Sequence, residues 1–286
     1  MTWKDHTLPS RSILAIFAHP DDESFCAGTL ARYVSEGASV GLVCATRGEV
    51  GEISDPALAT PETLPQVREA ELRCATRAIG IDDPIFLDYR DSGMAGTPEN
   101  QHPDAFINID PELVTGKLVR IIRERKPEVV ITFDETGGYG HPDHIAVWRH
   151  THAAVEAAAD GGRFTDAGEP WQVSRIAYGV FPRSFFMRMR EKLVELGEDT
   201  TDLDEFFEMG LGFDDDQIDV TIDVADYLDR KFAATDCHKT QFGGDNNFFA
   251  KVGEEELRRM MSREYFVIGW PARAADDSGM RDSLLD

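Results

Sequence analysis

The first half of the chain alternates short apolar runs with longer amphipathic segments. Apolar runs of strand length occur at 12–18, 40–45, 84–87 and 129–133, and segments with apolar residues at helical spacing lie between them at 22–36, 66–79 and 112–125. Parallel strands need a crossover connection, which a helix usually supplies. The pattern therefore predicts a Rossmann-like α/β fold, an open and mostly parallel sheet with helices on both faces.

The pattern weakens in the second half. After a polar connector at 160–170, the hydropathy predicts strands and helices at 176–181, 184–196, 217–224 and 225–235. We interpret residues 1–175 as the core and residues 176–286 as a smaller α+β extension of the same structural domain. Residues 275–286 are expected to be a frayed tail.

Charge narrows the classes of partner. The 286 residues are 42% hydrophobic and 29% charged, which is typical of a globular protein. Lys and Arg number 29 against 53 Asp and Glu, a formal charge of −24. Eleven of the acids lie between Thr201 and Asp229, where there is no Lys or Arg. Such a surface repels phosphate backbones and anionic lipids, so we expect no nucleic-acid partner.

The N-terminus has no signal-peptide pattern, and no apolar stretch reaches the length of a membrane span. We therefore expect a cytoplasmic protein without membrane insertion. Cys26, Cys44, Cys74 and Cys237 form no Cys-x-x-Cys pair, which favours reduced structural thiols over a disulfide framework. The sequence leaves the oligomeric state open, a homo-oligomer included.

Two motifs follow predicted strands. His19-Pro20-Asp21-Asp22-Glu23 follows the first strand, and His141-Pro142-Asp143-His144 follows the fourth. Ligands bind at the carboxyl ends of strands in open α/β sheets, so these side chains are expected to meet. His19, Asp22 and His144 would supply the three ligands of a catalytic zinc site and leave Asp21 and His141 for acid–base work. Each motif alone is also typical of a capped helix start.

A family resemblance emerges from these motifs. Residues 18–24, Ala-His-Pro-Asp-Asp-Glu-Ser, residues 90–94, Arg-Asp-Ser-Gly-Met, and residues 139–144, Tyr-Gly-His-Pro-Asp-His, occur in the order expected of one family. Over nearly its whole length the chain resembles the zinc-dependent LmbE-like, or PIG-L, de-N-acetylases. The resemblance is closest to the mycothiol-pathway deacetylase branch and the related S-conjugate amidase branch.

The resemblance implies a role for each motif residue. His19, Asp22 and His144 would bind Zn²⁺, although this ligand set also suits Fe²⁺. Asp21 would be the general base, and His141 the general acid and oxyanion partner. Asp143 would fix the His141 ring, and the mobile Tyr139 would close over the oxyanion.

Substrate contacts are carried over in the same way. Arg68 and Asp91 would bind sugar hydroxyls, and His238 would line the substrate channel, with the C-terminal extension completing the cleft. On residue pattern alone, Arg68 is typical of a helix surface and Asp91 of a turn. His150 and His152 are interpreted as surface or packing residues.

The implied function is a metal-dependent hydrolase that removes the N-acetyl group of an N-acetylglucosamine-type glycoconjugate through attack of a metal-bound water. Two alternatives stay open. One is an amidase that cleaves a thiol S-conjugate at its cysteinyl–glucosamine amide, and the other is a non-catalytic metal- or sugar-binding relative. Gly140 favours the deacetylase branch, because the amidase branch is expected to carry Pro there. The aglycone and the role of residues 201–229 stay open.

Overall fold

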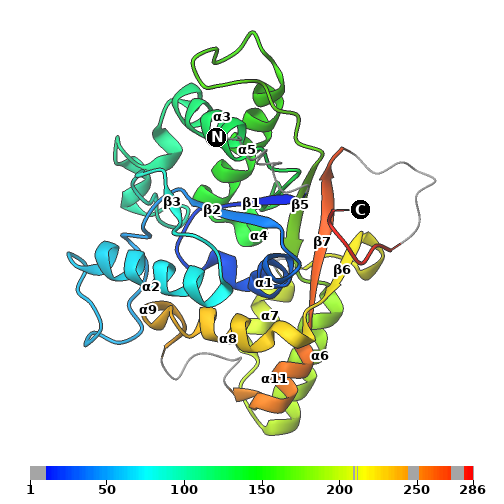
Figure 1. Ribbon diagram of the computed structural model, residues 1–286. Helices are drawn as coiled ribbons and strands as arrows, with labels where there is room; N and C mark the ends of the chain where they lie inside the picture. The colour runs from blue at the N-terminus through cyan, green and yellow to red at the C-terminus, as the bar shows by residue number, and fades with distance from the viewer. Residues whose placement is uncertain (1–10, 209, 211, 244–250, 272–279, 286) are drawn as a thin grey trace.

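The computed structural model describes residues 11–208, 210, 212–243, 251–271 and 280–285 (Figure 1). Its seven strands form one sheet in the order β3-β2-β1-β4-β5-β7-β6. The strands are β1 Ser12–Phe17, β2 Ser39–Cys44, β3 Ile85–Phe86, β4 Val129–Thr132, β5 Arg175–Val180, β6 Val220–Asp223 and β7 Arg263–Trp270. Strands β1 to β5 pair in parallel, whereas β7 is antiparallel to both β5 and β6. The predicted open, mostly parallel sheet is confirmed.

The sheet is covered on both faces. Figure 1 shows α3 and α5 on one face and α1, α2 and α8 on the other. The α-helices are α1 Ala27–Ser35, α2 Leu64–Ile79, α3 Pro111–Arg125, α4 Gly137–Gly140, α5 Pro142–Ala159, α6 Arg183–Leu196, α7 Thr201–Glu208, α8 Leu228–Thr235, α9 Lys239–Phe242 and α11 Glu254–Met260. In the described part of the chain the 3₁₀ turns are η1 Asp22–Phe25, η2 Pro98–Gln101, η3 Phe106–Asn108, η4 Asp215–Gln217 and η5 Ala225–Tyr227.

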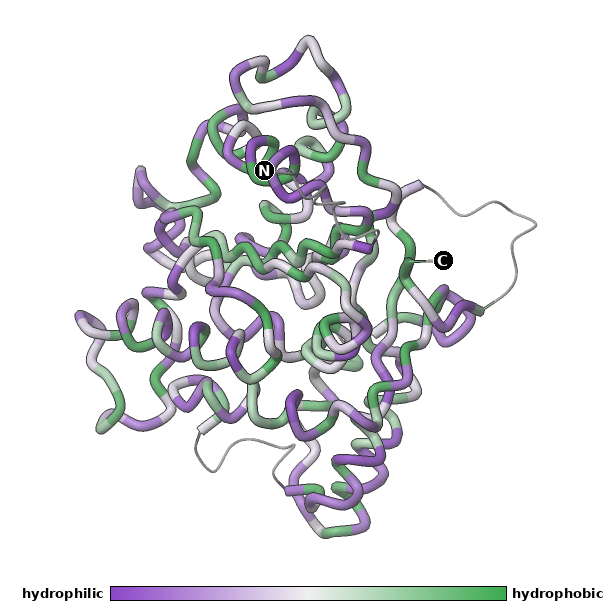
Figure 2. Tube along the Cα trace, viewed as in Figure 1, coloured by the Kyte–Doolittle hydropathy of each residue, from purple (hydrophilic) through white to green (hydrophobic). Residues whose placement is uncertain are grey.

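The centre of the sheet positions the two motifs. Strands β1 and β4 are buried along almost their full length because helices cover both faces, and Figure 2 shows these central strands as continuous hydrophobic segments. β2 and β4 flank β1, so the strand order reverses between β1 and β4. Ligands of open α/β sheets bind at this switch point. The segments that leave β1 and β4 carry the two motifs.

Several elements differ from the predictions. The helix expected over 22–36 is a 3₁₀ turn, η1, followed by α1, and the strand expected over 84–87 is reduced to β3. The sequence pattern gave no indication of α7, α11 or β7. Glu264 lies at a buried position of β7, so this strand lacks a clean apolar alternation.

The tail prediction is wrong for the part that is described. Leu284 is fully buried, and its N–H donates to the Tyr33 hydroxyl at 2.7 Å. Residues 272–279 and 286 lie outside the described residues. Within the described part of the chain, no helix is long and apolar enough to cross a membrane.

The cysteine prediction is also wrong in part. Cys74 on α2 and Cys237, which follows α8, form a disulfide across a sequence separation of 163 residues. Their Cα atoms are 5.8 Å apart, which two packed helices permit and a reading of sequence spacing does not reveal. Cys26 and Cys44 are free and buried, as expected of structural thiols.

Candidate metal centre

Three predicted ligands converge at the carboxyl ends of β1 and β4. His19 Nδ1 lies 3.2 Å from His144 Nε2, which lies 3.4 Å from Asp22 Oδ1. The other Asp22 oxygen lies 3.8 Å from His19 Nδ1. A tetrahedral ion with bonds of about 2.0–2.2 Å holds its ligand atoms about 3.3–3.6 Å apart. The spacing of these atoms therefore suits a small divalent cation.

Hydrogen bonds set the tautomers of both rings. His144 Nδ1 lies 3.0 Å from the Gly137 carbonyl, to which it donates, and His19 Nε2 lies 3.2 Å from Asp143 Oδ2. When these nitrogens donate, the lone pairs of His19 Nδ1 and His144 Nε2 face each other. Two lone pairs at 3.2 Å repel unless a proton or a metal ion lies between them. The donor set therefore fits a metal ion.

The carboxylate of Asp22 is fixed in the same way. Its Oδ2 accepts the backbone N–H groups of Ala18 and His19, at 3.1 and 2.7 Å, which leaves Oδ1 directed at His144. Burial raises the pKa of Asp22 to about 6. Burial alone lowers the pKa of His19, but hydrogen bonds to Asp143 and Asp91 outweigh it and hold this pKa well above its usual value. The negative surroundings thus favour positive charge at the centre.

His141 lies beside this set with a different hydrogen-bonding state. Donor atoms of His19, His141 and His144 lie within 4.8 Å of one another, so proximity alone would also admit His141 as a ligand. However, its Nδ1 accepts the N–H of Asp143 at 3.2 Å. The neutral ring then carries its proton on Nε2, which makes it a donor and not a metal ligand. Burial, helped by the neighbouring His19 and His144, lowers the pKa of His141 to about 3.

Asp21 is held in an unusual backbone conformation. Its φ is 117°, in the left-handed region that L-residues with a side chain rarely adopt. Glu23 supports this turn, because its Oε2 accepts the Asp21 N–H at 3.1 Å. Arg68 Nη2 lies 3.2 Å from Asp21 Oδ2. Burial raises the pKa of Asp21 to about 6, and the Arg68 charge opposes that rise. A carboxylate whose pKa is close to neutral pH therefore lies beside the predicted ligands.

Arg68 is an internal residue of α2. It is only 3% exposed, so the interpretation as a surface residue is wrong. Its guanidinium donates to the carbonyls of Pro20 and Gly48, at 2.6 and 3.1 Å, and pairs with Asp21. A Cβ at Gly48, whose φ is +65°, or at Gly51 would overlap this guanidinium. The two glycines therefore make room for an arginine that joins the loops after β1 and β2.

Asp91 and Asp143 both support His19. Asp91 Oδ1 lies 3.5 Å from His19 Nε2, and the Asp91 carboxylate also accepts the N–H groups of Val50 and Gly93. Burial raises the pKa of Asp91, but the contacts with His19 reverse this effect and hold it below its usual value.

The expected contact between the Asp143 carboxylate and His141 is not found. The Asp143 Oδ2 atom accepts from His19 and from Ser92 N–H, and the buried Oδ1 has no hydrogen-bond partner among the described residues. The backbone N–H of Asp143 holds the His141 ring instead, because it lies at the first turn of α5.

His238 is fully buried, so the expectation that it lines the substrate channel is wrong. Its Nε2 lies 2.6 Å from Glu23 Oε1. Burial lowers its pKa, but the charge of Glu23 outweighs this effect and raises it overall. His238 therefore supports Glu23, which in turn supports Asp21.

Tyr139 stands at the rim of the site. It is 50% exposed, and its ring centre lies 5.0 Å from that of His144 and 6.2 Å from that of His141. The adjoining Gly137 has a φ of +65°, and a Cβ there would lie 2.7 Å from His144 Cβ. This close approach lets the Gly137 carbonyl reach the His144 ring.

His150 and His152 lie outside the site, as expected. His150 is buried and its ring lies 5.6 Å from that of Phe106, whereas His152 Nε2 lies 2.7 Å from the Tyr178 hydroxyl. The supporting roles of Glu23 and Ser92 could not be predicted from the sequence. Glu23 was visible within the first motif, but its partner lies 215 residues away, and Ser92 acts through its backbone N–H, which no residue type reveals.

Comparison with known proteins identifies relatives over most of the chain. A family model described as PIG-L, GlcNAc-PI de-N-acetylase, matches residues 14–158. Two curated relatives are both called 1D-myo-inositol 2-acetamido-2-deoxy-alpha-D-glucopyranoside deacetylase. The one from Geodermatophilus obscurus is 40% identical over 292 aligned residues, which cover 97% of this chain and 98% of the relative. The one from Thermobispora bispora is 39% identical over an alignment that covers 91% of this chain and 89% of the relative.

Solved structures share the fold. A conserved protein from Thermus thermophilus is 26% identical with a TM-score of 0.58, over 92% of this chain and 96% of that one. The N,N'-diacetylchitobiose deacetylase from Pyrococcus horikoshii has a TM-score of 0.62 over 90% and 83% of the two chains. At 21% identity, this second likeness supports the fold alone.

Proposed function

Because the chain belongs to the GlcNAc-PI de-N-acetylase (PIG-L) family, we propose that it is an N-deacetylase whose substrate is 1D-myo-inositol 2-acetamido-2-deoxy-α-D-glucopyranoside. The observation that carries the proposal is the convergence of three ligand atoms, with the Asp21 carboxylate and the His141 imidazole, which are not ligands, beside them. The sugar is inferred from the names of the curated relatives, and amide hydrolysis is inferred from the residues of the site.

The proposed metal ligands are His19 Nδ1, Asp22 Oδ1 and His144 Nε2, and zinc is the proposed ion, with ferrous iron as the alternative. A bound zinc ion would polarise the acetyl carbonyl and lower the pKa of a water molecule. Asp143 and Asp91 orient His19 for this role.

The chain's own groups would move the protons. Asp21 accepts a proton from the attacking water at the carboxylate oxygen that Arg68 does not hold. His141 donates a hydrogen bond from Nε2 to the oxygen that gains charge in the tetrahedral state, and the proton that Asp21 has taken from the water is the one that the departing amine then receives. Tyr139, at the rim, adds a hydroxyl donor when it turns inward.

The purified, zinc-loaded protein tests the proposal directly. Incubation with the inositol glycoside should release acetate and a free amine in equal amounts. An enzymatic assay measures the acetate, and an amine-reactive dye measures the amine. The matched control is Asp21→Asn, which should retain zinc and lose about 100-fold or more in kcat. Cleavage of a bimane-labelled thiol conjugate without deacetylation would favour the amidase alternative. Tight sugar binding without turnover would favour the non-catalytic one.

The cytoplasm is the proposed location, although the Cys74–Cys237 disulfide opposes it because disulfides are rare there. Cell fractionation decides between the cytoplasm and a compartment in which disulfides persist. The oligomeric state stays open, a homo-oligomer included, and light scattering of the purified chain measures it.

A further inference from the structure

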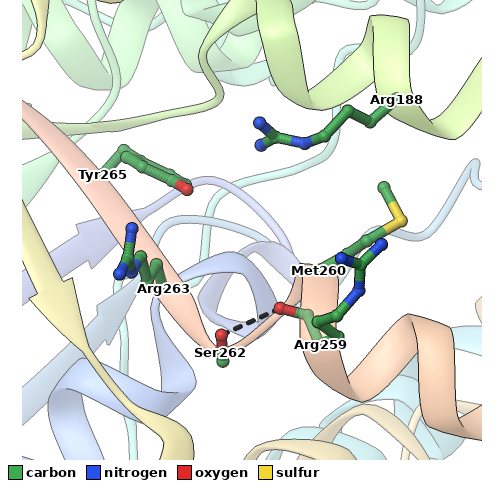
Figure 3. Close-up of a pocket in the computed structure, with 6 residues that line it drawn as sticks. All are labelled: Arg188, Arg259, Met260, Ser262, Arg263 and Tyr265. Atoms are coloured by element: carbon green, nitrogen blue, oxygen red, sulfur yellow. Dashed lines mark hydrogen bonds between the residues drawn. The ribbon is translucent and has the colours of Figure 1, made fainter.

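A pocket away from the metal centre lies between α6, the end of α11 and the start of β7 (Figure 3). Its volume is about 310 Å³, and it is lined by Arg188, Arg259, Met260, Ser262, Arg263 and Tyr265. Three of the lining residues are arginines and none is acidic. In a chain with a formal charge of −24, such a lining calls for a physical explanation.

Only one of the three guanidinium groups is neutralised among the residues that the structure describes. Glu256 holds Arg259 through contacts of 3.0 and 2.5 Å. Arg188 and Arg263 form no ion pair with any residue in the described ranges. Asp223 faces Arg263 across the β6–β7 pairing, but its carboxylate accepts the N–H of Ala225 instead. Counting Glu256 and Asp223 against the three arginines, the pocket and its surroundings carry a net charge near +1.

The side chains reach one space from separate elements. In Figure 3 the Arg188 guanidinium, from α6, and the Tyr265 hydroxyl, from β7, are directed toward the space between them. The Tyr265 hydroxyl makes no hydrogen bond with the described residues. The Ser262 hydroxyl, in contrast, donates to the Arg259 carbonyl at 2.8 Å and is not free to donate to a ligand. The donors directed into this space are the Arg188 guanidinium and the Tyr265 phenol, and Arg263 adds a second unpaired guanidinium to the lining.

We propose that this pocket binds a small phosphate monoester. A phosphate monoester carries about −1.5 to −2 charges at pH 7, opposite in sign to the net charge of the pocket. Arginine forks suit phosphate oxygens because they donate two parallel hydrogen bonds. The volume lies at the lower end of the range for small-molecule sites, about 300–1,000 Å³, and exceeds what a bare phosphate needs. The acidity elsewhere on the surface is screened beyond about 8–10 Å at physiological salt.

Calorimetric titration of the zinc-loaded protein with glucose 6-phosphate tests the proposal. We expect saturable binding that weakens with added salt. Arg188→Gln and Arg263→Gln should each weaken binding about tenfold, and Arg188→Lys, which keeps the charge without the fork, should lose less. Arg125→Gln is the matched control, because Arg125 is an exposed arginine at the end of α3 that does not line this pocket, and the affinity of this variant should stay within about twofold of wild type.

Each other outcome overturns the proposal. Equal affinity in wild type and Arg188→Gln would place the phosphate elsewhere, the metal centre included. Tighter binding of citrate than of the ester would assign the pocket to carboxylates, and capture by phosphatidic acid vesicles without binding of soluble esters would assign it to a lipid headgroup. If no binding is detected at 10 mM ester, a Kd that would correspond to about 2.7 kcal/mol, the arginines are surface charges that bind no ester. Arg188 is exposed, so its substitution should leave the melting temperature unchanged, and deacetylation by the same samples checks the metal centre independently.

Discussion

Replacing Arg68 with Gln removes the one cation that contacts Asp21 among the described residues. The charges lie 3.2 Å apart, and their attraction is about 1.3 kcal/mol even at the dielectric constant of water. That energy corresponds to about one pKa unit, and a neighbouring arginine commonly lowers the pKa of an aspartate by about 1–3 units. The pKa of Asp21, about 6 with Arg68 present, should therefore rise to about 7 or above in Arg68→Gln.

The consequence is a shift in the pH dependence of activity. A general base works only when ionised, so kcat/KM should be present above the pKa of Asp21 and lost as the pH falls through it. At pH 6 the ionised fraction would fall from about one half to about one eleventh, a loss of about fivefold, whereas at pH 9 the loss should be small. Profiles of kcat/KM from about pH 5 to 9, with zinc content measured at each pH, show the shift.

Two controls separate this role from direct substrate binding. Arg68→Lys retains the charge and should keep the acidic limb of the profile near its wild-type position. Arg77→Gln removes an exposed arginine of the same helix and should change nothing. If Arg68 binds sugar hydroxyls instead, Arg68→Gln would raise KM and leave the limb in place, and that result would refute the reasoning.

Three further changes probe the supporting contacts. Glu23→Ala leaves the Asp21 N–H and His238 without their buried partner, so it should lower stability by about 2–4 kcal/mol in urea titrations, whereas Glu23→Gln should recover part of the loss. Tyr139→Phe should reduce kcat about tenfold or more while leaving zinc content and stability unchanged, because Tyr139 is half-exposed and its hydroxyl is the only group removed. The double variant Cys74→Ser, Cys237→Ser should unfold about 2–4 kcal/mol more easily, and dithiothreitol should reproduce that loss in wild type; equal stability with and without the reductant would contradict the disulfide.

The metal ligands could be predicted because their chemistry is local. His19 and Asp22 lie in one short motif and His144 in another, and the strand-to-helix alternation is enough to bring two strand ends together. Their tautomers could not be predicted, because the group that sets the His19 tautomer is distant in sequence and the His144 tautomer is set by the backbone carbonyl of Gly137, which no residue type reveals. The Asp143 carboxylate, for example, reaches His19 across 124 residues and not its near neighbour His141.

The second half of the fold was harder to predict for a related reason. A strand is recognised by alternating apolar residues, but Glu264 in β7 points inward and is only 3% exposed. It is tolerated there because its carboxylate accepts the N–H groups of Gly28 and Thr29 and pairs with Lys231 at 2.7 Å. Glu264, whose residue type is typical of the protein surface, is thus a buried cap for the N-terminus of α1.

This cap illustrates how part of the acidity is used. Glu264 lies opposite the N-terminus of α1, where a carboxylate satisfies free N–H groups and the helix dipole favours negative charge. Glu71 holds the Thr240 N–H and hydroxyl at 2.8 and 2.6 Å, and Glu23 holds Asp21 and His238. In each case a buried carboxylate joins the N-terminal half to the C-terminal third. The geometry of the base therefore depends on residues far outside the two motifs, and replacing these acids should disturb the site without touching a metal ligand.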